Sequence, residues 1–187
     1  MAEKRKLLVF KPDLSPHPSS QDWPRYYDNT MEFLTCSASC APEGLVVFIE
    51  GASLKERDAA LAFCASLLSH PATSGIPLVC VLAEQHRRLL EELGRLGVEQ
   101  VAFRPKNAPL PVGPGLYCMG QNLAEVLERT CPYLNHRAMD QCKEMVHCSA
   151  YRNRLIIGRE RRTEVCETES HRACPYFLAP KRAASQA

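Results

Sequence analysis

The sequence lacks a long uninterrupted run of apolar residues. Although apolar residues make up 45% of the 187-residue chain, no stretch approaches the ~20 residues that a helix needs to cross a bilayer. The opening MAEKRKLLVF holds only the short apolar run LLVF before Lys11 and Pro12, which is too little for a signal peptide. We therefore expect a cytoplasmic protein that does not insert into a membrane.

The chain also lacks a strong excess of charge of either sign. A formal net charge of +2 excludes a chain that binds nucleic acid or a membrane surface over its whole length. The charge changes near residue 130, however, because residues 1–130 hold 13 basic and 15 acidic side chains and residues 131–187 hold 10 and 6. This shift predicts two modules, residues 1–130 and residues 131–178, followed by a disordered tail over residues 179–187.

Ten cysteines are present, and in a cytoplasmic chain they are expected to be thiols or metal ligands rather than disulfides. Cys64 and Cys80 lie inside apolar stretches, where a free cysteine packs as a small hydrophobe. Cys36 and Cys40 form C-x3-C, a weak signal because no second pair lies nearby. Cys118 stands alone.

Strand and helix patterns alternate along residues 1–130. Short apolar runs rich in β-branched residues predict strands within residues 6–10, 44–51, 76–84 and 98–103. Helical spacing of apolar residues predicts helices within residues 53–70, 83–97 and 120–130. Ser53 and Glu56 have the spacing of a capping box. The alternation predicts an α/β fold with a doubly wound, mostly parallel sheet.

The run from GLVVFIEG through SGIPLVCVLAE to LGVEQVAFRPK resembles the second half of a response-regulator receiver domain, of flavodoxin-like fold. The resemblance covers roughly residues 5–128 and is best from Gly44 to Lys106. In that family one strand ends in the phosphoacceptor aspartate, a later strand ends in Thr or Ser, and the next ends in Lys-Pro. The corresponding residues here are Ile49, Glu50 and Gly51 for the aspartate, Leu82 and Ala83 for the hydroxyl, and Arg104-Pro105 for Lys-Pro.

Phosphoryl chemistry needs a carboxylate-held Mg²⁺ and a cation on the transferred group. Arg104 conservatively replaces the lysine, and the other parts are absent. The acidic pair after the first strand is missing, because VFKPDL offers only Asp13. We expect a receiver-like domain that is not phosphorylated. It either supports the rest of the chain as a scaffold or binds a protein partner, and no catalytic residue is assigned to it.

The second module carries five cysteines and repeats the motif Cys-Pro-Tyr, first in CPYL and then in CPYF. Its cysteines are Cys131, Cys142, Cys148, Cys166 and Cys174. The spacing is not that of a zinc finger, which pairs ligands as C-x2–4-C. Separate loops can nevertheless deliver four thiolates to one metal or around a cubane. A module this short has little core of its own, which favours a metal.

The pattern also resembles a small module at the ends of bacterial proteins, of the form CPYL … HRC … YC … CPxY. Its four cysteines correspond to Cys131, Cys148, Cys166 and Cys174, although VH precedes Cys148 and EV precedes Cys166 here. Cys142 or His171 could supply an additional ligand. Isolated cysteines and Cys-Pro steps favour a 4Fe–4S cluster, with Zn²⁺ as the alternative.

An arginine stretch lies between Cys148 and Cys166. It consists of Arg152, Arg154, Arg159, Arg161 and Arg162. Such a stretch could bind nucleic-acid phosphates, form a solvated basic face, or offset the negative charge of a cluster. It matches no docking motif.

Together the two modules predict a regulatory or adaptor protein that acts through a protein partner rather than through catalysis. The alternatives are an iron–sulfur redox or electron-transfer component of a larger complex, and a DNA-binding regulator.

Overall fold

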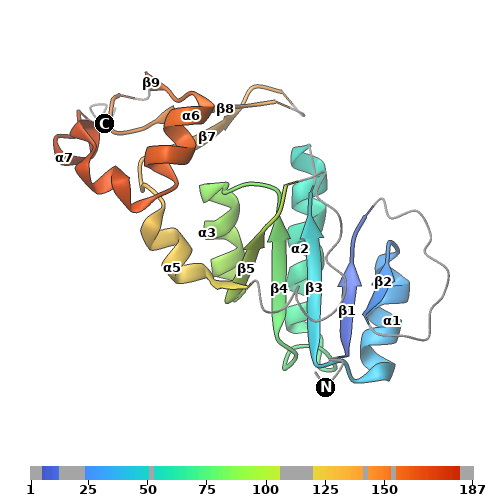
Figure 1. Ribbon diagram of the computed structural model, residues 1–187. Coiled ribbons are helices and arrows are strands. Elements are labelled where there is room, and N and C mark those ends of the chain that lie inside the picture. The colour runs from blue at the N-terminus through green and yellow to red at the C-terminus, as the bar shows by residue number, and fades with distance from the viewer. Residues whose placement is uncertain are drawn as a thin grey trace. The chain divides into compact units, whose positions relative to one another are not determined.

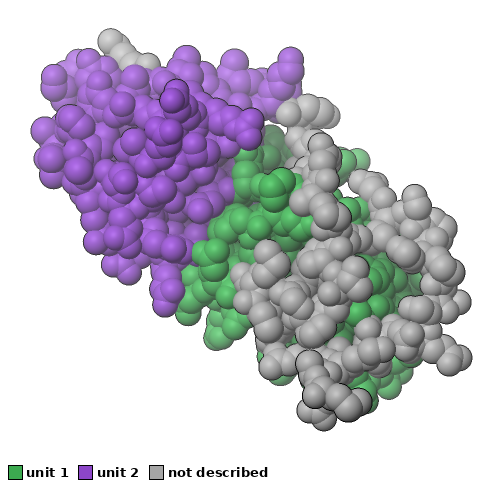
Figure 2. All heavy atoms as spheres, in the orientation of Figure 1, with its two compact units in different colours: residues 1–84, 93–123 green, residues 85–92, 124–187 purple. Residues whose placement is uncertain are grey.

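The computed structural model of the chain describes residues 6–12, 24–50, 53–105, 120–140, 143–152 and 155–181. The chain forms two compact units, which Figure 2 colours separately. Unit 1 comprises residues 1–84 and 93–123, and unit 2 comprises residues 85–92 and 124–187. Residues 85–92 thus belong to the same unit as the cysteine-rich segment, which no local pattern in the sequence indicates.

Unit 1 contains a six-stranded sheet (Figure 1). Its strands are β1 (Leu7–Phe10), β2 (Arg25–Tyr27), β3 (Gly44–Ile49), β4 (Leu78–Leu82), β5 (Gln100–Phe103) and β6 (Gln121–Asn122). They are arranged in the order β2-β1-β3-β4-β5-β6, with the first five parallel and β6 antiparallel. The order of the parallel strands is that of a doubly wound, flavodoxin-like sheet. In such a sheet the order in which strands are added changes side, here between β1 and β3, while the strands stay parallel. The predicted α/β class is confirmed.

The central strands form because their sequences are apolar on both faces. Every residue of β1, β3 and β4 is buried. One set of alternating residues packs into a single cluster, made of Val9, Val46, Phe48, Val79, Val81 and Ala102. Strands β2 and β6 were not predicted from the sequence, because they are three and two residues long and carry no such apolar run.

Residues next to the ends of three helices explain where these helices begin or end. The helices are α1 (Thr30–Cys40), α2 (Leu54–Ser69) and α3 (Arg87–Leu96). The predicted capping box of Ser53 and Glu56 opens α2, and Asn29 caps α1 by accepting from two backbone N–H groups. Helix α3 stops before Gly97, whose φ of 92° suits a residue without a side chain. None of the helices in the described residues is long and apolar enough to cross a bilayer.

Aromatic rings attach α1 and α2 to the sheet of unit 1. The ring of Phe10 on β1 lies 5.8 Å from that of Phe33 on α1 and 4.6 Å from that of Phe63 on α2. Phe33 and Phe63 also contact each other edge to face, at 5.6 Å. Both helices therefore cover the face of β1 that presents Phe10, and such ring pairs add to the free energy of burial.

Unit 2 is built from short elements around a small core. It contains α5 (Leu123–Arg129, with Leu123 still in unit 1), β7 (Leu134–Ala138), β8 (Glu144–Cys148), β9 (Leu155–Ile156), α6 (Arg159–Arg161), the π-helical turn η1 (Arg162–Cys166), the 3₁₀ helix η2 (Glu169–Ala173) and α7 (Pro175–Leu178). The three strands form an antiparallel sheet in chain order. Residues 182–187 of the predicted tail lie outside the described residues, and Arg152 donates its N–H to the carbonyl oxygen of Lys181 at 2.9 Å.

Candidate functional site

Three of the four predicted cysteine ligands lie in the core of unit 2. Cys131, Cys148 and Cys166 are all buried and belong to one hydrophobic cluster with Leu134 and Ile157. The cysteines come from separate segments, namely the turn after α5, the end of β8 and the end of η1. The backbone N–H of Cys131 donates to the carbonyl oxygen of Cys166 at 2.7 Å, which holds two of these segments together.

The fourth cysteine, Cys174, interacts electrostatically with Cys131 and Cys166. Burial raises the pKa of Cys166 to about 12, and the negative charges of Cys131, Cys148 and Cys174 contribute to the same shift. Burial also raises the pKa of Cys131, with further contributions from Cys148 and Cys174. Cys174 thus lies close enough to Cys131 and Cys166 to affect their ionisation.

The repeated Cys-Pro-Tyr places backbone N–H groups near both of its sulfurs. Burial raises the pKa of Cys131, and the nearby N–H groups of Tyr133 and Leu134 act against this shift. The N–H of Leu134 donates to the carbonyl oxygen of Cys131 at 3.1 Å. At Cys174, burial opposes ionisation but the N–H groups of Tyr176 and Phe177, with Arg161, outweigh it and lower the pKa. Proline has no N–H and a fixed φ, so the next two amides are the ones that turn toward the sulfur.

Charged groups of the arginine stretch support this cysteine site. Arg161 approaches the Cys174 sulfur, with Nη2 to Sγ at 3.5 Å, and its guanidinium lies over the ring of Tyr176. Arg162 forms an ion pair with Glu167 at 3.1 Å, in which both side chains are largely buried. Arg152 and Arg159 are exposed, and Arg154 lies outside the described residues. Contacts to Cys174 and Glu167 account for Arg161 and Arg162 without a nucleic-acid partner.

His171 has the hydrogen bonding of a potential metal ligand. Its side chain is 3% exposed, and its Nδ1 lies 2.7 Å from the carbonyl oxygen of Thr168. A carbonyl only accepts, so Nδ1 carries the proton and Nε2 keeps its lone pair. Histidines that bind metals are commonly oriented in this way. The other suggested ligand, Cys142, lies outside the described residues.

The described arrangement does not match a site for a single metal ion. No group of three or more His, Cys, Asp or Glu side chains among the described residues is placed to hold one ion. Four thiolates around one zinc have sulfurs only about 3.8 Å apart, as follows from Zn–S bonds of about 2.3 Å. In a 4Fe–4S cluster each thiolate binds a different iron, so the sulfurs lie farther apart.

Comparisons with known protein families, with curated proteins and with solved structures find no match to this chain. Function therefore has to be argued from its sites.

A second site lies at the carboxyl edge of the sheet in unit 1. Lys11, Glu50 and Arg104 directly follow β1, β3 and β5. The Glu50 carboxylate lies 3.4 Å from Lys11 Nζ and 3.1 Å from Arg104 Nη1. The exposed fractions of the three side chains are 17%, 12% and 7% for Lys11, Glu50 and Arg104. Both cations also lie over the ring of Phe48.

This edge is where doubly wound folds bind their ligands, and among the described residues it carries an ion network of three side chains. The receiver resemblance placed Ile49 or Glu50, then Gly51, at the phosphoacceptor position and Arg104 at the lysine, and the structure pairs Glu50 with Arg104. At the end of β4, Leu82 is buried and Ala83 has no hydroxyl. Asp13 lies outside the described residues.

We expect that unit 1 takes up no phosphoryl group from acetyl phosphate and Mg²⁺, because the acceptor carboxylate is already paired with two cations. Intact-mass measurement should show no added phosphate. The variant Glu50→Asp is a matched control and should also stay unmodified, since an aspartate alone does not recruit Mg²⁺. A hydroxylamine-labile phosphate mapped to Glu50 would contradict the prediction.

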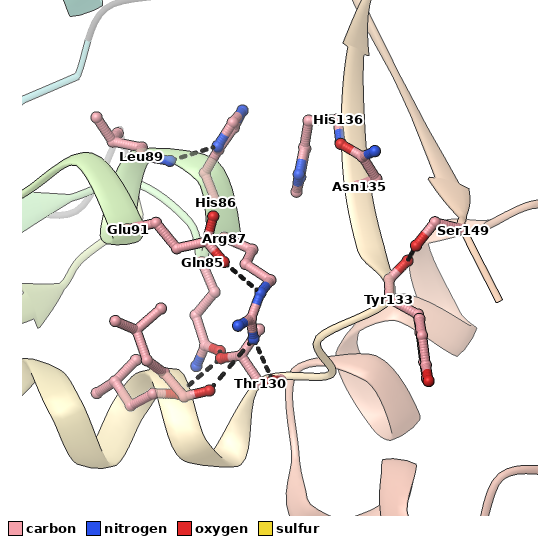
Figure 3. A network of polar contacts seen from close by, with 12 residues as sticks. Gln85, His86, Arg87, Leu89, Glu91, Thr130, Tyr133, Asn135, His136 and Ser149 are labelled. Carbon is pink, nitrogen blue, oxygen red and sulfur yellow. Dashed lines mark hydrogen bonds and ion pairs between the residues drawn. The ribbon is translucent and has the colours of Figure 1, made fainter. Parts of the chain in front are cut away.

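Sequence patterns missed a polar network that attaches residues 85–92 to the rest of unit 2 (Figure 3). His86 caps α3, because its Nδ1 accepts from the N–H of Leu89 at 3.2 Å, and its Nε2 donates to Glu144 at 3.0 Å. Its ring stacks on that of His136 at 3.8 Å. Arg87 donates to the carbonyl oxygen of Thr130 at 2.6 Å.

These partners are separated by roughly forty to sixty positions along the chain. No motif or local spacing connects residues that far apart. The one available signal was the start of the predicted helix, where His86 precedes Arg87 and Arg88.

Proposed function

We propose that this protein is a non-catalytic regulatory or adaptor protein, in which a receiver-like unit that is not phosphorylated is joined to a four-cysteine metal module. The observation that carries the proposal is the burial of three of the four cysteines, Cys131, Cys148 and Cys166, in one cluster. Thiolates from separate segments can bind one metal centre. The module would mediate contacts with a protein partner, or sense a signal through the state of its metal.

The proposed cofactor is a 4Fe–4S cluster held by Cys131, Cys148, Cys166 and Cys174, with Zn²⁺ as the alternative. Such a cluster supplies a redox-active centre whose potential depends on hydrogen bonds to sulfur and on exposure to solvent. Arg161 would offset part of its negative charge through Cys174. His171, with Nε2 carrying a lone pair, is the candidate replacement if one cysteine does not bind.

A second candidate function is electron transfer within a larger complex. It is favoured by the partial exposure of Cys174, in contrast to the three buried cysteines. A cluster bound there would have one corner close to solvent, from which an electron could pass to a partner.

Metal analysis of protein purified without oxygen tests the proposal. A cluster would give about four iron and four sulfide per chain and a brown colour with absorption near roughly 400 nm. One equivalent of zinc without iron would leave the regulatory proposal in place and remove the electron-transfer candidate. Absence of both metals from full-length protein would contradict the proposed module.

If iron is present, a redox titration separates the two candidate functions. Reversible reduction without loss of iron supports electron transfer. Loss of the cluster on a redox change supports sensing.

A further inference from the structure

Unit 1 contains a pair of cysteines in contact, far along the chain from the four-cysteine module. Cys36 and Cys40 lie one turn apart on α1, and their sulfurs are 2.9 Å apart. Residues at i and i+4 of a helix share one face, so the C-x3-C spacing makes this contact a consequence of the helix. Both side chains are half-buried, and neither is in a disulfide.

A cation from a different element lies against both sulfurs. Arg25, on β2, places Nη1 3.8 Å from Cys36 Sγ and 3.6 Å from Cys40 Sγ. Tyr27 of the same strand hydrogen-bonds with both Cys36 and Arg25. The four side chains therefore form one cluster of two thiols, a guanidinium and a phenol.

The environment favours ionisation of Cys40. Its pKa is lowered, first by the hydrogen bond with Cys36, then by that with Ser39, and also by Arg25, while burial acts in the opposite direction. Tyr27 behaves differently, because burial and its hydrogen bond with Cys36 raise its pKa to about 12. At neutral pH the cluster thus holds a thiol inclined to ionise beside a phenol that keeps its proton.

Another thiol pair in unit 1 provides a contrast. The sulfurs of Cys64 and Cys80 are 3.7 Å apart, but both side chains are fully buried in the core. The hydrogen bond with Cys64 and burial raise the pKa of Cys80 well above its ordinary value. A buried neutral thiol is a poor nucleophile, so the chain carries one pair suited to reaction and one that is inert.

We propose that Cys36 and Cys40 form a redox-active dithiol that reduces hydroperoxides and closes to a disulfide within α1. The Cys40 thiolate attacks one peroxide oxygen. An S–O bond forms, the O–O bond breaks, and the sulfur gives up two electrons to the leaving hydroxide or alkoxide, which takes a proton to become water or an alcohol. Cys36 then displaces hydroxide from the sulfenic acid, giving the disulfide and one water.

The surrounding groups suit both steps. The guanidinium of Arg25 can stabilise negative charge as it develops on the leaving oxygen. For the second step, helix geometry separates the Cα atoms of Cys36 and Cys40 by about 6 Å, within the range that a disulfide spans. Cys40 is the last residue of α1 and precedes Ala41, which has a positive φ of 43°. Any backbone movement needed to form the disulfide therefore occurs at the end of the helix.

Tryptic peptides make the test site-specific in the full-length protein. Residues 26–55 hold Cys36 and Cys40 and no other cysteine, and residues 58–87 hold Cys64 and Cys80 and no other cysteine. Reduced protein is treated with one equivalent of hydrogen peroxide at pH 7, alkylated, digested and analysed by mass spectrometry. Peptide 26–55 should lose two hydrogens and escape alkylation, and it should react about tenfold faster than glutathione, because its thiol is more readily ionised. Peptide 58–87 should stay reduced.

Variants then assign the roles. Cys36→Ser should leave Cys40 as a sulfenic acid that dimedone traps, because no second thiol resolves it. Arg25→Gln should slow the reaction about tenfold, and Arg25→Lys, which keeps the charge, should restore most of the rate. In Arg25→Gln the two cysteines appear on peptide 7–55, again with no other cysteine.

Two results would overturn the proposal. One is a peptide 26–55 that stays reduced, or reacts no faster than glutathione. The other is oxidation of peptides 26–55 and 58–87 at equal rates. An unchanged rate in Arg25→Gln would overturn the role of the arginine. None of these outcomes depends on the metal content of unit 2.

Discussion

Replacing any one of Cys131, Cys148, Cys166 or Cys174 with serine is expected to lower the metal content and to make residues 131–178 sensitive to protease. Serine does not replace a thiolate ligand, and for a small metal site the free energy of binding is also free energy of folding. Three of these cysteines form the core of unit 2, so the loss should affect the whole unit. Unit 1 should stay folded, because its buried strands form a separate cluster.

Metal analysis and limited proteolysis of each variant measure these effects. Cys64→Ala is the matched control, since Cys64 is equally buried but lies in unit 1, and it should leave the metal content unchanged. Cys142→Ser should also leave it unchanged if the four named cysteines are the ligands. Equal metal content in the wild type and in all four serine variants would contradict the assignment.

Replacing Glu50 with glutamine is expected to lower the free energy of unfolding of unit 1 by about 3 kcal/mol, because it leaves two largely buried cations without their counter-charge. Lys11 and Arg104 are 17% and 7% exposed, so water compensates little for the lost carboxylate. Urea unfolding followed by circular dichroism measures the change.

Glu92→Gln gives the reference value for an exposed ion pair, although Glu92 belongs to unit 2 and its effect is measured on the unfolding of that unit. Glu92 pairs with Arg88 one helical turn away, and the arginine is 64% exposed. Exposed pairs of this kind contribute about 0.5 kcal/mol or less. A loss at Glu50 as small as that at Glu92 would mean that the ion network adds little to the stability of the sheet edge.

The ion network also shows which charged residues of the sheet edge the receiver resemblance identified and which it did not. The resemblance to receiver domains placed Glu50 among the residues at the phosphoacceptor position and Arg104 at the lysine position, and the structure brings these side chains within 3.1 Å of each other. Lys11 was not singled out, because its position after the first strand matters only once β1 lies beside β3. The resemblance located the edge of the sheet but not its full set of charges.

The sequence by itself determined the features that depend on neighbours along the chain. Continuous apolar runs defined β1, β3, β4 and β5, since burial on both faces requires them. Ser53 and Glu56 marked the start of α2, and Gly97 marked the end of α3. The repeated Cys-Pro pointed to the cysteine site, because proline acts on the residues next to it.

Only the tertiary structure decided which distant groups meet. Arg25 lies on a three-residue strand that has no apolar pattern, yet strand pairing and the packing of α1 place it against Cys36 and Cys40. His86 and Glu144 are 58 positions apart, and their hydrogen bond makes residues 85–92 part of unit 2. The physical reason is the same in both cases. Periodicity records which side of an element is buried, whereas a contact between two elements depends on how the whole chain folds back on itself.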